Sequence, residues 1–461
     1  MATTTVSGMT QDRLLRTIRV RNRHEPGVLG RLATALGALG ATIGNISTDA
    51  ITEHYTVRDL DLLVDDEQHL QRVLDAVRAL SDTMLLEVRD EVLQVHSGGK
   101  IRMVSRLPIT TVAALRKAYT PGVAEVCLKI KEQPELALSY TGIPWSVAIV
   151  TDGTAILGLG NIGPIAGMPV MEGKAALLEQ LVGLSGVPIL VDSTKPDDIV
   201  RAVELIAPTF GAIQLEDIGS PACFEVDQRL RESLDMPVFQ DDQQGTAAVA
   251  LAAVLGACRL TGRSINDVCI GGIGLGAAGL SIADLLHTYT GQKILGADIN
   301  ADAIARHEAL GNEGGTLHDV MARCDLVIAT TGVQGLIKPS MVRPGQVILA
   351  LSNPKPEITP AEALAAGAAY AADGTSVNNV LGFPGLLRGA LEVNARRFVP
   401  EMYVAVGLAI AGMAGEGELV PSPLNRRVHL AVTLAVARAA VETGVARQSF
   451  DEELLATRFR A

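Results

Sequence analysis

Two pairs of adjacent carboxylates stand where two apolar runs end. Glu216 and Asp217 close the first run, and Asp241 and Asp242 close the second. If the runs are neighbouring parallel strands, the carboxylates converge on the crevice where open α/β sheets bind ligands. Several hard oxygens there would bind Mg²⁺ or Mn²⁺. Either pair alone could be a solvated loop or a helix N-cap, but together they favour a divalent-metal site.

A glycine-rich turn supplies the second chemical signal. It follows the apolar run 268–272, precedes a helical stretch at 280–289, and is followed by a second apolar run, 293–297, that ends in an acid. This context predicts a dinucleotide site with the pyrophosphate at a helix N-terminus and the acid on a ribose hydroxyl. An acid at that position favours NAD over NADP, although Arg306 one helix along leaves NADP open. The expected cofactor residues are Gly274, Gly276, Ala277, Ala278, Gly279 and Asp298.

The elements around these residues follow an alternating order. Beyond Gly98-Gly99-Lys100, short apolar runs alternate with amphipathic stretches such as Lys174 to Leu184 and Pro196 to Ile206. Alternation of this kind is typical of parallel sheets with helices on both faces. We therefore expect an α/β substrate and metal domain at 101–247 and a Rossmann-like, doubly wound dinucleotide-binding domain with C-terminal helices at 248–461.

The first 96 residues have a different order. Strict period-two apolarity at 15–20 predicts a strand, and it is followed by a helix to about Leu39, strands at 42–51 and 55–64, a helix at 66–80 and a strand at 85–95. A βαββαβ unit of this kind forms a ferredoxin-like antiparallel sheet with two helices on one face. With Pro26-Gly27-Val28-Leu29 and Asn45-Ile46, the segment 12–96 resembles the ACT domain, which implies a small-molecule effector. A plain dimerisation module is the alternative.

Composition limits the partners. The chain has 461 residues, of which 48% are hydrophobic and 20% charged, which is typical of a globular protein. A net charge of −12 and a pI near 5.2 disfavour nucleic acid and anionic membranes. The apolar span from Met402 to Met413 is shorter than the ~20 residues a bilayer requires. Five cysteines without a CxxC motif or a secretory signal predict reduced thiols in the cytoplasm.

Seven runs occur in the order found in malic enzymes, and the chain from Ile101 onward resembles that family in its shorter bacterial form. The runs lie at 118–124, 150–160, 171–174, 214–218, 240–247, 352–354 and 378–385. The resemblance implies oxidative decarboxylation of L-malate to pyruvate and CO₂, with reduction of NAD and a bound Mg²⁺ or Mn²⁺. It also implies a role for each matched residue: Lys174 as general base, Tyr119 as general acid, Glu216, Asp217 and Asp242 as metal ligands, Asn353 and Asn379 at the substrate carboxylates, and Asn353 also beside the cofactor.

This chemistry makes demands on its residues. Lys174 must be neutral to take the C2 hydroxyl proton, so we expect desolvation or the metal charge to lower its pKa. Ala155 stands where larger members carry a substrate-binding arginine, and Gln240 and Gln244 replace histidines. The substrate carboxylate is then expected to be held by the asparagines or by another subunit.

Two alternatives remain open at this stage. One is a metal-independent hydroxy-acid dehydrogenase with an ACT domain, and the other is a non-catalytic effector-binding protein. Because ACT-like sheets commonly pair, we expect a homodimer or a higher homo-oligomer.

Overall fold

The computed structural model describes residues 13–156 and 158–460. The chain forms two compact units, which divide between Arg102 and Met103. The outermost residues of the expected domains, Asp12 and Ala461, lie outside the described residues, as does Leu157 within the run 150–160.

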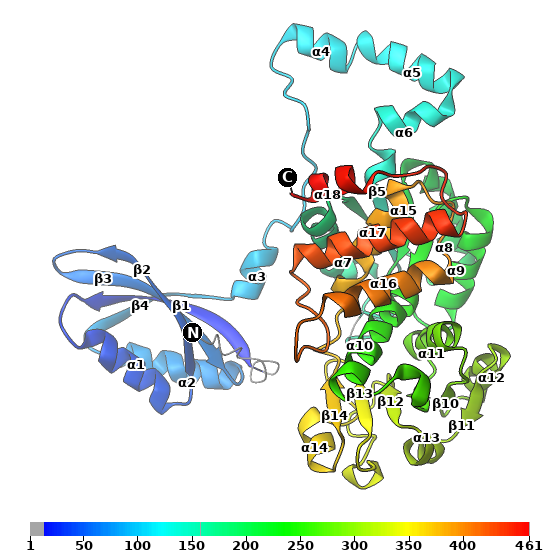
Figure 1. The fold of residues 1–461 in the computed structure, drawn as a ribbon. Coiled ribbons are helices and arrows are strands. Elements are labelled where there is room, and N and C mark those ends of the chain that lie inside the picture. The colour runs from blue at the N-terminus through cyan, green and yellow to red at the C-terminus, as the bar shows by residue number, and fades with distance from the viewer. Residues whose placement is uncertain (1–12, 157, 461) are drawn as a thin grey trace. The chain divides into compact units, whose positions relative to one another are not determined.

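The N-terminal unit is a four-stranded antiparallel sheet in the order β2-β3-β1-β4. Figure 1 shows α1 and α2 together on one face of the sheet. Alternate residues such as Ile18, Val20, Leu60 and Leu62 are buried beneath these helices, as the period-two pattern predicts. The elements are β1 Leu14–Arg23, α1 Val28–Ala38, β2 Thr42–Ile51, β3 Tyr55–Val64, α2 Glu67–Arg78, β4 Thr83–Arg89 and α3 Glu91–His96.

The last strand predicted for this unit, 85–95, is wrong in its second half. The strand β4 ends at Arg89, and the following residues form the helix α3. Asp90 caps this helix, since its side chain accepts a hydrogen bond from the backbone N–H of Leu93 at 3.0 Å. An N-cap of this kind satisfies a free amide of the first turn and so favours a helix over a continued strand.

The C-terminal unit contains two parallel sheets, and the first carries the predicted acidic cluster. Its strand order is β6-β5-β7-β8. The residues of β5 and β7 are almost entirely buried and apolar, as in parallel sheets covered on both faces. The elements are β5 Ser146–Thr151, α7 Pro164–Val182, β6 Ser185–Leu190, α8 Pro196–Ile206, β7 Ala212–Leu215, α9 Ala222–Ser233 and β8 Val238–Gln240.

The second parallel sheet has six strands in the order β11-β10-β9-β12-β13-β14. This is the doubly wound order of dinucleotide-binding folds, so the Rossmann prediction is confirmed. The elements are β9 Ile270–Ile273, α11 Ala277–Thr290, β10 Leu295–Ala297, α12 Ala301–Ala309, β11 Glu313–Gly315, α13 Leu317–Arg323, β12 Leu326–Ala329, β13 Val347–Ala350, α14 Pro360–Ala365 and β14 Tyr370–Asp373.

Further helices complete this unit. The helix α10, Thr246–Leu260, spans the predicted domain boundary between 247 and 248 and is buried over most of its length. Three short helices precede β5: α4 Val112–Ala118, α5 Gly122–Glu132 and α6 Ala137–Tyr140. The others are α10 Thr246–Leu260, α15 Phe383–Glu392, α16 Pro400–Met413, α17 Arg426–Glu442 and α18 Glu452–Arg460. Across the described part of the chain, every helix is too short or too polar to span a bilayer.

Candidate active site

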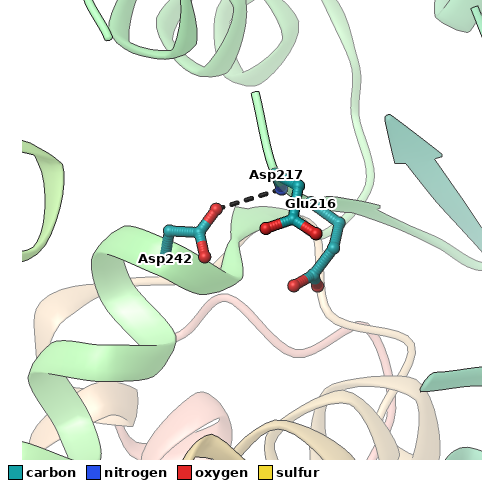
Figure 2. Close-up of side chains that lie close together, drawn as sticks. All are labelled: Glu216, Asp217 and Asp242. Atoms are coloured by element: carbon teal, nitrogen blue, oxygen red, sulfur yellow. Dashed lines mark hydrogen bonds between the residues drawn. The ribbon is translucent and has the colours of Figure 1, made fainter. Parts of the chain in front are cut away.

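The carboxyl ends of β7 and β8 bring three acidic side chains together. Each of Glu216, Asp217 and Asp242 offers an oxygen within 4.8 Å of the others. Figure 2 shows the three carboxylates lying close together. Because β7 and β8 are neighbouring parallel strands, their ends meet at one edge of the sheet. The backbone of Asp217 has a φ of 53°, a left-handed conformation that is uncommon for a non-glycine residue and clusters at functional sites. The predicted acidic residues therefore do converge.

Hydrogen bonds fix the orientation of these carboxylates. The backbone N–H of Asp217 donates to Oδ2 of Asp242 at 3.0 Å, and Nε2 of Gln214 donates to Oε2 of Glu216 at 2.8 Å. Oδ2 of Asp217 is buried and has no hydrogen-bond partner among the described residues. A buried, orphaned carboxylate oxygen beside two further carboxylates fits a hard divalent cation.

The electrostatics of the cluster agree with a cation site. Burial, and then the neighbouring charge of Asp242, raises the pKa of Asp217 to about 7. Burial is also the main reason that the pKa values of Glu216 and Asp242 are raised. Like charges held together out of water resist ionisation unless a cation compensates them. The donor set therefore suits Mg²⁺ or Mn²⁺.

Lys174 lies next to this cluster. Its Nζ is 2.5 Å from Oδ2 of Asp241 and 3.1 Å from Oε1 of Glu216. The ammonium also lies 4.7 Å from the ring centre of Phe383. A surface position at a helix N-terminus is excluded, because Lys174 lies within α7 and its side chain is largely buried.

The expected direction of the pKa shift of Lys174 is wrong for this structure. Burial would lower the pKa of Lys174, but the charges of Asp241 and Glu216 outweigh burial and raise the pKa. The expectation rested on desolvation or on the charge of a bound metal, whereas direct ion pairs with two carboxylates stabilise the ammonium. A neutral Lys174 therefore requires a change in the charge around these carboxylates.

Gln240 and Gln244 form a buried link behind the cluster. Nε2 of Gln240 donates to Oδ2 of Asp242 at 2.9 Å, and its backbone N–H donates to Oε1 of Gln244 at 2.9 Å. Gln244 in turn donates to Asp227, which pairs with Arg231 at 3.0 Å. The chain of contacts ends at Tyr403, whose hydroxyl accepts from Arg231 at 3.2 Å. The two glutamines thus support an acidic residue that the site requires.

A π-helical turn at Asp241–Gly245 carries this part of the site. Such single turns are rare and occur frequently at functional sites. Gly245 is required there, because a Cβ on it would lie 2.1 Å from Oδ1 of Asp241. The turn places Asp241 toward Lys174 while Asp242 remains in the acidic cluster.

Asn379 joins the site, whereas Asn353 lies on a separate loop. Nδ2 of Asn379 is 3.2 Å from Oδ2 of Asp241 and 2.9 Å from Oγ1 of Thr246. Asn353 donates instead to the carbonyl of Gly374 at 3.2 Å.

A second buried carboxylate, Glu357, holds the loop of Asn353. Its Oε1 accepts from Oγ of Ser352 at 2.6 Å and from Oγ1 of Thr331 at 2.7 Å. Thr331 follows β12 and Ser352 follows β13, so Glu357 ties together two loops at the carboxyl edge of the Rossmann sheet. The loop of Asn353 also approaches the loop that follows β5, because a Cβ on Gly158 would lie 3.3 Å from Pro354.

Tyr119 is not brought into contact with Lys174. It follows α4, its side chain makes no hydrogen bond with the described residues, and it is 66% exposed. No residue of α4 or α5 is buried. In this chain alone, the predicted acid therefore stays apart from the predicted base.

The glycine-rich turn has the geometry of a dinucleotide site. Gly274 has a φ of 89°, and a Cβ on Gly279 would lie 1.8 Å from the carbonyl oxygen of Gly274. Gly276 precedes α11 without a side-chain cap, so the first amides of the helix face outward for a phosphate. Ala277 and Ala278 form the first turn of α11.

A cavity of about 580 Å³ lies beside this turn and is lined by Gly274, Gly276 and Asp298 among others. Asp298 accepts from the backbone N–H of Leu275 at 2.6 Å, which fixes its carboxylate at the end of β10. Arg306, which left NADP open, lies 5.6 Å from the ring centre of Phe224.

Sequence reasoning missed four supporting residues of this region: Phe383, Thr246, Asp227 and Glu357. Phe383 and Thr246 come from elements distant in sequence from Lys174 and Asn379, which they contact, whereas Glu357 supports the loop in which it lies. The motif Gly382–Gly385 was noted, but no periodicity in the sequence could place its phenylalanine against a lysine in α7.

Comparison with known proteins agrees with this geometry. Residues 99–231 match the malic enzyme N-terminal domain, residues 243–306 match the malic enzyme NAD binding domain, and residues 11–85 match the ACT domain. The NAD-dependent malic enzyme 1 of Bacillus subtilis (strain 168) is 53% identical over 430 residues, which cover 93% of this chain and 98% of that protein. The bifunctional malic/malolactic enzyme of the same organism is 40% identical over 404 residues, or 81% of this chain and 98% of that protein.

A solved structure gives the same result. The malic enzyme from Pyrococcus horikoshii Ot3 superposes with a TM-score of 0.75 at 37% identity and covers 80% of this chain and 94% of its own. With such matches over nearly its whole length, and with the carboxylate cluster, the lysine and the Rossmann sheet in place, the chain belongs to the malic enzyme family.

Proposed function

We propose that the protein catalyses the oxidative decarboxylation of L-malate to pyruvate and CO₂ with reduction of NAD. The observation that carries this proposal is the contact of Lys174 with Asp241 beside the cluster of Glu216, Asp217 and Asp242. A hydroxy-acid oxidation needs a base, and the decarboxylation needs an electrophile for the developing enolate. This donor set is not explained by the two alternatives, a metal-independent dehydrogenase and a non-catalytic binding protein.

The residues divide the work as follows. A divalent cation held by Glu216, Asp217 and Asp242 would stabilise negative charge on the substrate oxygens. Lys174 would take the C2 hydroxyl proton, and a bound nicotinamide would accept the hydride. Asn379, which already reaches Asp241, is placed to hold a substrate carboxylate, and Asn353 approaches from the Rossmann edge.

The protonation state of Lys174 depends on its two carboxylate neighbours. With both carboxylates charged, the ammonium form is favoured. Glu216 would share its charge with a bound cation, which would weaken one of the two ion pairs of Lys174 and favour the neutral amine. The base then becomes available when the site is loaded.

A steady-state assay tests this function. Purified protein with L-malate, NAD and Mn²⁺ should form NADH and pyruvate, and EDTA should abolish both products until Mn²⁺ is restored. Activity that survives EDTA would support the metal-independent dehydrogenase. Absence of NADH under all conditions would support the non-catalytic protein.

We propose NAD rather than NADP as the working cofactor. The carboxylate of Asp298 ends β10 beside the cavity, where it repels a 2′-phosphate. Arg306 lies over the ring of Phe224, 5.6 Å from its centre. A preference of kcat/KM for NADP would contradict this assignment.

We further propose that the protein works as a homo-oligomer of at least two copies. Apolar side chains along 103–140 are exposed, among them Met103 at 96% and Val112 at 68%. An apolar surface of this extent is typical of an interface. If a second copy covers this segment, Tyr119 can reach the Lys174 site of that copy and protonate C3 of the enol there.

Mixing two inactive variants tests the shared site. Tyr119→Phe and Lys174→Ala should each be nearly inactive, and their co-refolded mixture should regain activity because one site of the mixed dimer has both residues intact. The matched control is Tyr140→Phe, which is exposed on the same segment and should remain active. No recovery in a mixture with proven hetero-dimers would place both residues of one site on one chain.

We propose that the ACT domain binds a small anion. A cavity of about 350 Å³ is lined by Arg23, Arg58 and the start of α1 at Gly27, and this helix has no side-chain cap. Cations and free helix amides favour a carboxylate.

We also propose that the enzyme works in the cytoplasm. The five cysteines are free, which suits a reducing compartment.

Calorimetry with a panel of amino acids and organic acids tests the anion site. Arg58→Ala should weaken binding, and Arg72→Ala, which is exposed on α2, should not. Equal affinity for both variants would contradict the site.

A further inference from the structure

The N-terminal edge of the Rossmann sheet holds two thiols that the reaction does not use. Cys269 directly precedes β9 and is exposed, whereas Cys324 follows α13 and is buried. Their sulfur atoms are 3.6 Å apart. Because the cofactor turn follows the opposite ends of these strands, this pair is separate from the site described above.

The backbone holds the two cysteines on adjacent chains. The N–H of Asp325 donates to the carbonyl of Cys269 at 2.8 Å, and the N–H of Cys269 donates to Oδ2 of Asp325 at 3.1 Å. On the other side, the carbonyl of Cys324 accepts from Gln346 at 2.8 Å and from Arg343 at 2.6 Å. The sheet therefore fixes the backbone spacing of the two cysteines.

A glycine makes room for the buried sulfur. A Cβ on Gly271 would lie 2.6 Å from Sγ of Cys324. The sulfur thus sits against the bare backbone of β9, next to the sulfur of Cys269. A disulfide requires an S–S distance of about 2.05 Å, so the two sulfurs must approach by roughly 1.5 Å, a movement that a change in the two side-chain torsions can supply.

We propose that Cys269 and Cys324 form a reversible disulfide when the protein meets a hydroperoxide, with Cys269 as the attacking thiolate and Cys324 as the resolving thiol. Exposure makes Cys269 the thiol that a peroxide can reach. Burial raises the pKa of Cys324, which keeps that residue a thiol until its partner is oxidised.

The chemistry balances in two steps. The thiolate of Cys269 attacks one peroxide oxygen, so that an S–O bond forms, the O–O bond breaks and hydroxide leaves. The sulfur of Cys324 then attacks the sulfur of Cys269, the S–S bond forms, the S–O bond breaks, and water leaves with the proton of Cys324. Two thiols are oxidised by two electrons, and the hydroperoxide is reduced. An external dithiol reverses the change by exchange.

Peptide mass spectrometry of the full-length protein tests the site. After hydrogen peroxide and alkylation of free thiols, the wild type should contain a peptide pair joined through Cys269 and Cys324 that is lost on reduction by dithiothreitol. Cys269→Ser and Cys324→Ser should each lose this pair completely. Cys258→Ser, which removes a buried cysteine elsewhere, should retain it.

Dimedone trapping separates the two roles. In Cys324→Ser, the sulfenic acid on Cys269 cannot be resolved, so dimedone should label Cys269 more strongly than in the wild type. In Cys269→Ser, Cys324 should stay unlabelled because it is buried. Equal labelling of Cys269 in the wild type and in Cys324→Ser, or a wild type without the joined pair, would overturn the proposal.

Discussion

Replacement of Gln240 by alanine should weaken metal binding without unfolding the site. The amide of Gln240 donates to Oδ2 of Asp242 at 2.9 Å and accepts from the backbone N–H of Gln243 at 2.7 Å. Only the first bond bears on the metal ligand. The second caps the turn that carries Asp242 and touches no metal ligand, so its loss is expected to lower stability to a similar extent with and without metal.

The size of the loss in metal affinity depends on the hydrogen bonds that Asp242 keeps in the variant. A hydrogen bond to a charged group contributes about 1.5–3 kcal/mol, but the backbone N–H of Asp217 still donates to the same oxygen of Asp242 at 3.0 Å. Asp242 therefore keeps one of two orienting contacts. Loss of a supporting contact of this kind typically costs about 10- to 100-fold in metal affinity, which is about 1.4–2.8 kcal/mol.

Titration of Mn²⁺ followed by electron paramagnetic resonance of the free ion measures this affinity directly. Gln244→Ala, which acts only through the backbone of Gln240, should show a smaller loss, and the double variant should lose less than the sum of the two. Gln228→Ala, an exposed glutamine on α9 that bonds Glu232, is the matched control and should bind as the wild type does. An unchanged Kd for Gln240→Ala would refute the role assigned to the link.

Three further predictions address the base, the acidic cluster and the cofactor. Lys174→Ala should lower kcat by about 10²- to 10⁴-fold, the usual contribution of a general base, while the Kd for NAD from fluorescence titration stays near that of the wild type; near-normal turnover would remove Lys174 as the base. For Asp217, whose pKa is raised to about 7, the proton stabilises the metal-free fold below that pH and competes with the cation. The rise in Tm that Mn²⁺ causes should therefore grow as the pH passes upward through 7, and Asp217→Asn should flatten this dependence; an equal slope in both proteins would contradict the shift. Asp298→Ala should raise the KM for NAD by about tenfold, since one hydrogen bond from a ribose hydroxyl to a charged acceptor is lost, and a KM equal to that of the wild type would show that Asp298 does not contact the ribose.

The sequence predicted elements best where burial dictates a period or a continuous apolar run. The strands at 42–51 and 55–64 and the helix at Pro196–Ile206 have the predicted bounds. The helix expected from Lys174 instead starts at Pro164 and continues through Pro169. Proline inside a helix is normally disfavoured. The packing of α7 on β5 and β6 therefore outweighs the local effect of Pro169.

The acidic residues could be found from the sequence because each follows a strand end. The resemblance to malic enzymes also implies that Asp241 lies beside Lys174. The residue pattern alone does not, since this contact joins α7 to the turn after β8 and depends on how a helix and a strand pack. The resemblance to malic enzymes named Tyr119, and the folded chain leaves it exposed. One chain's sequence does not state whether a second copy completes a site.

Isotope-resolved product analysis tests the central claim most directly. The protein with [4-¹³C]malate, NAD and Mn²⁺ should release labelled CO₂ and unlabelled pyruvate, each in an amount equal to the NADH formed. Lys174→Ala should release both products at least about 10²-fold more slowly. Labelled oxaloacetate in place of CO₂ would contradict the decarboxylation, and labelled CO₂ with lactate and no net NADH would contradict the oxidative outcome.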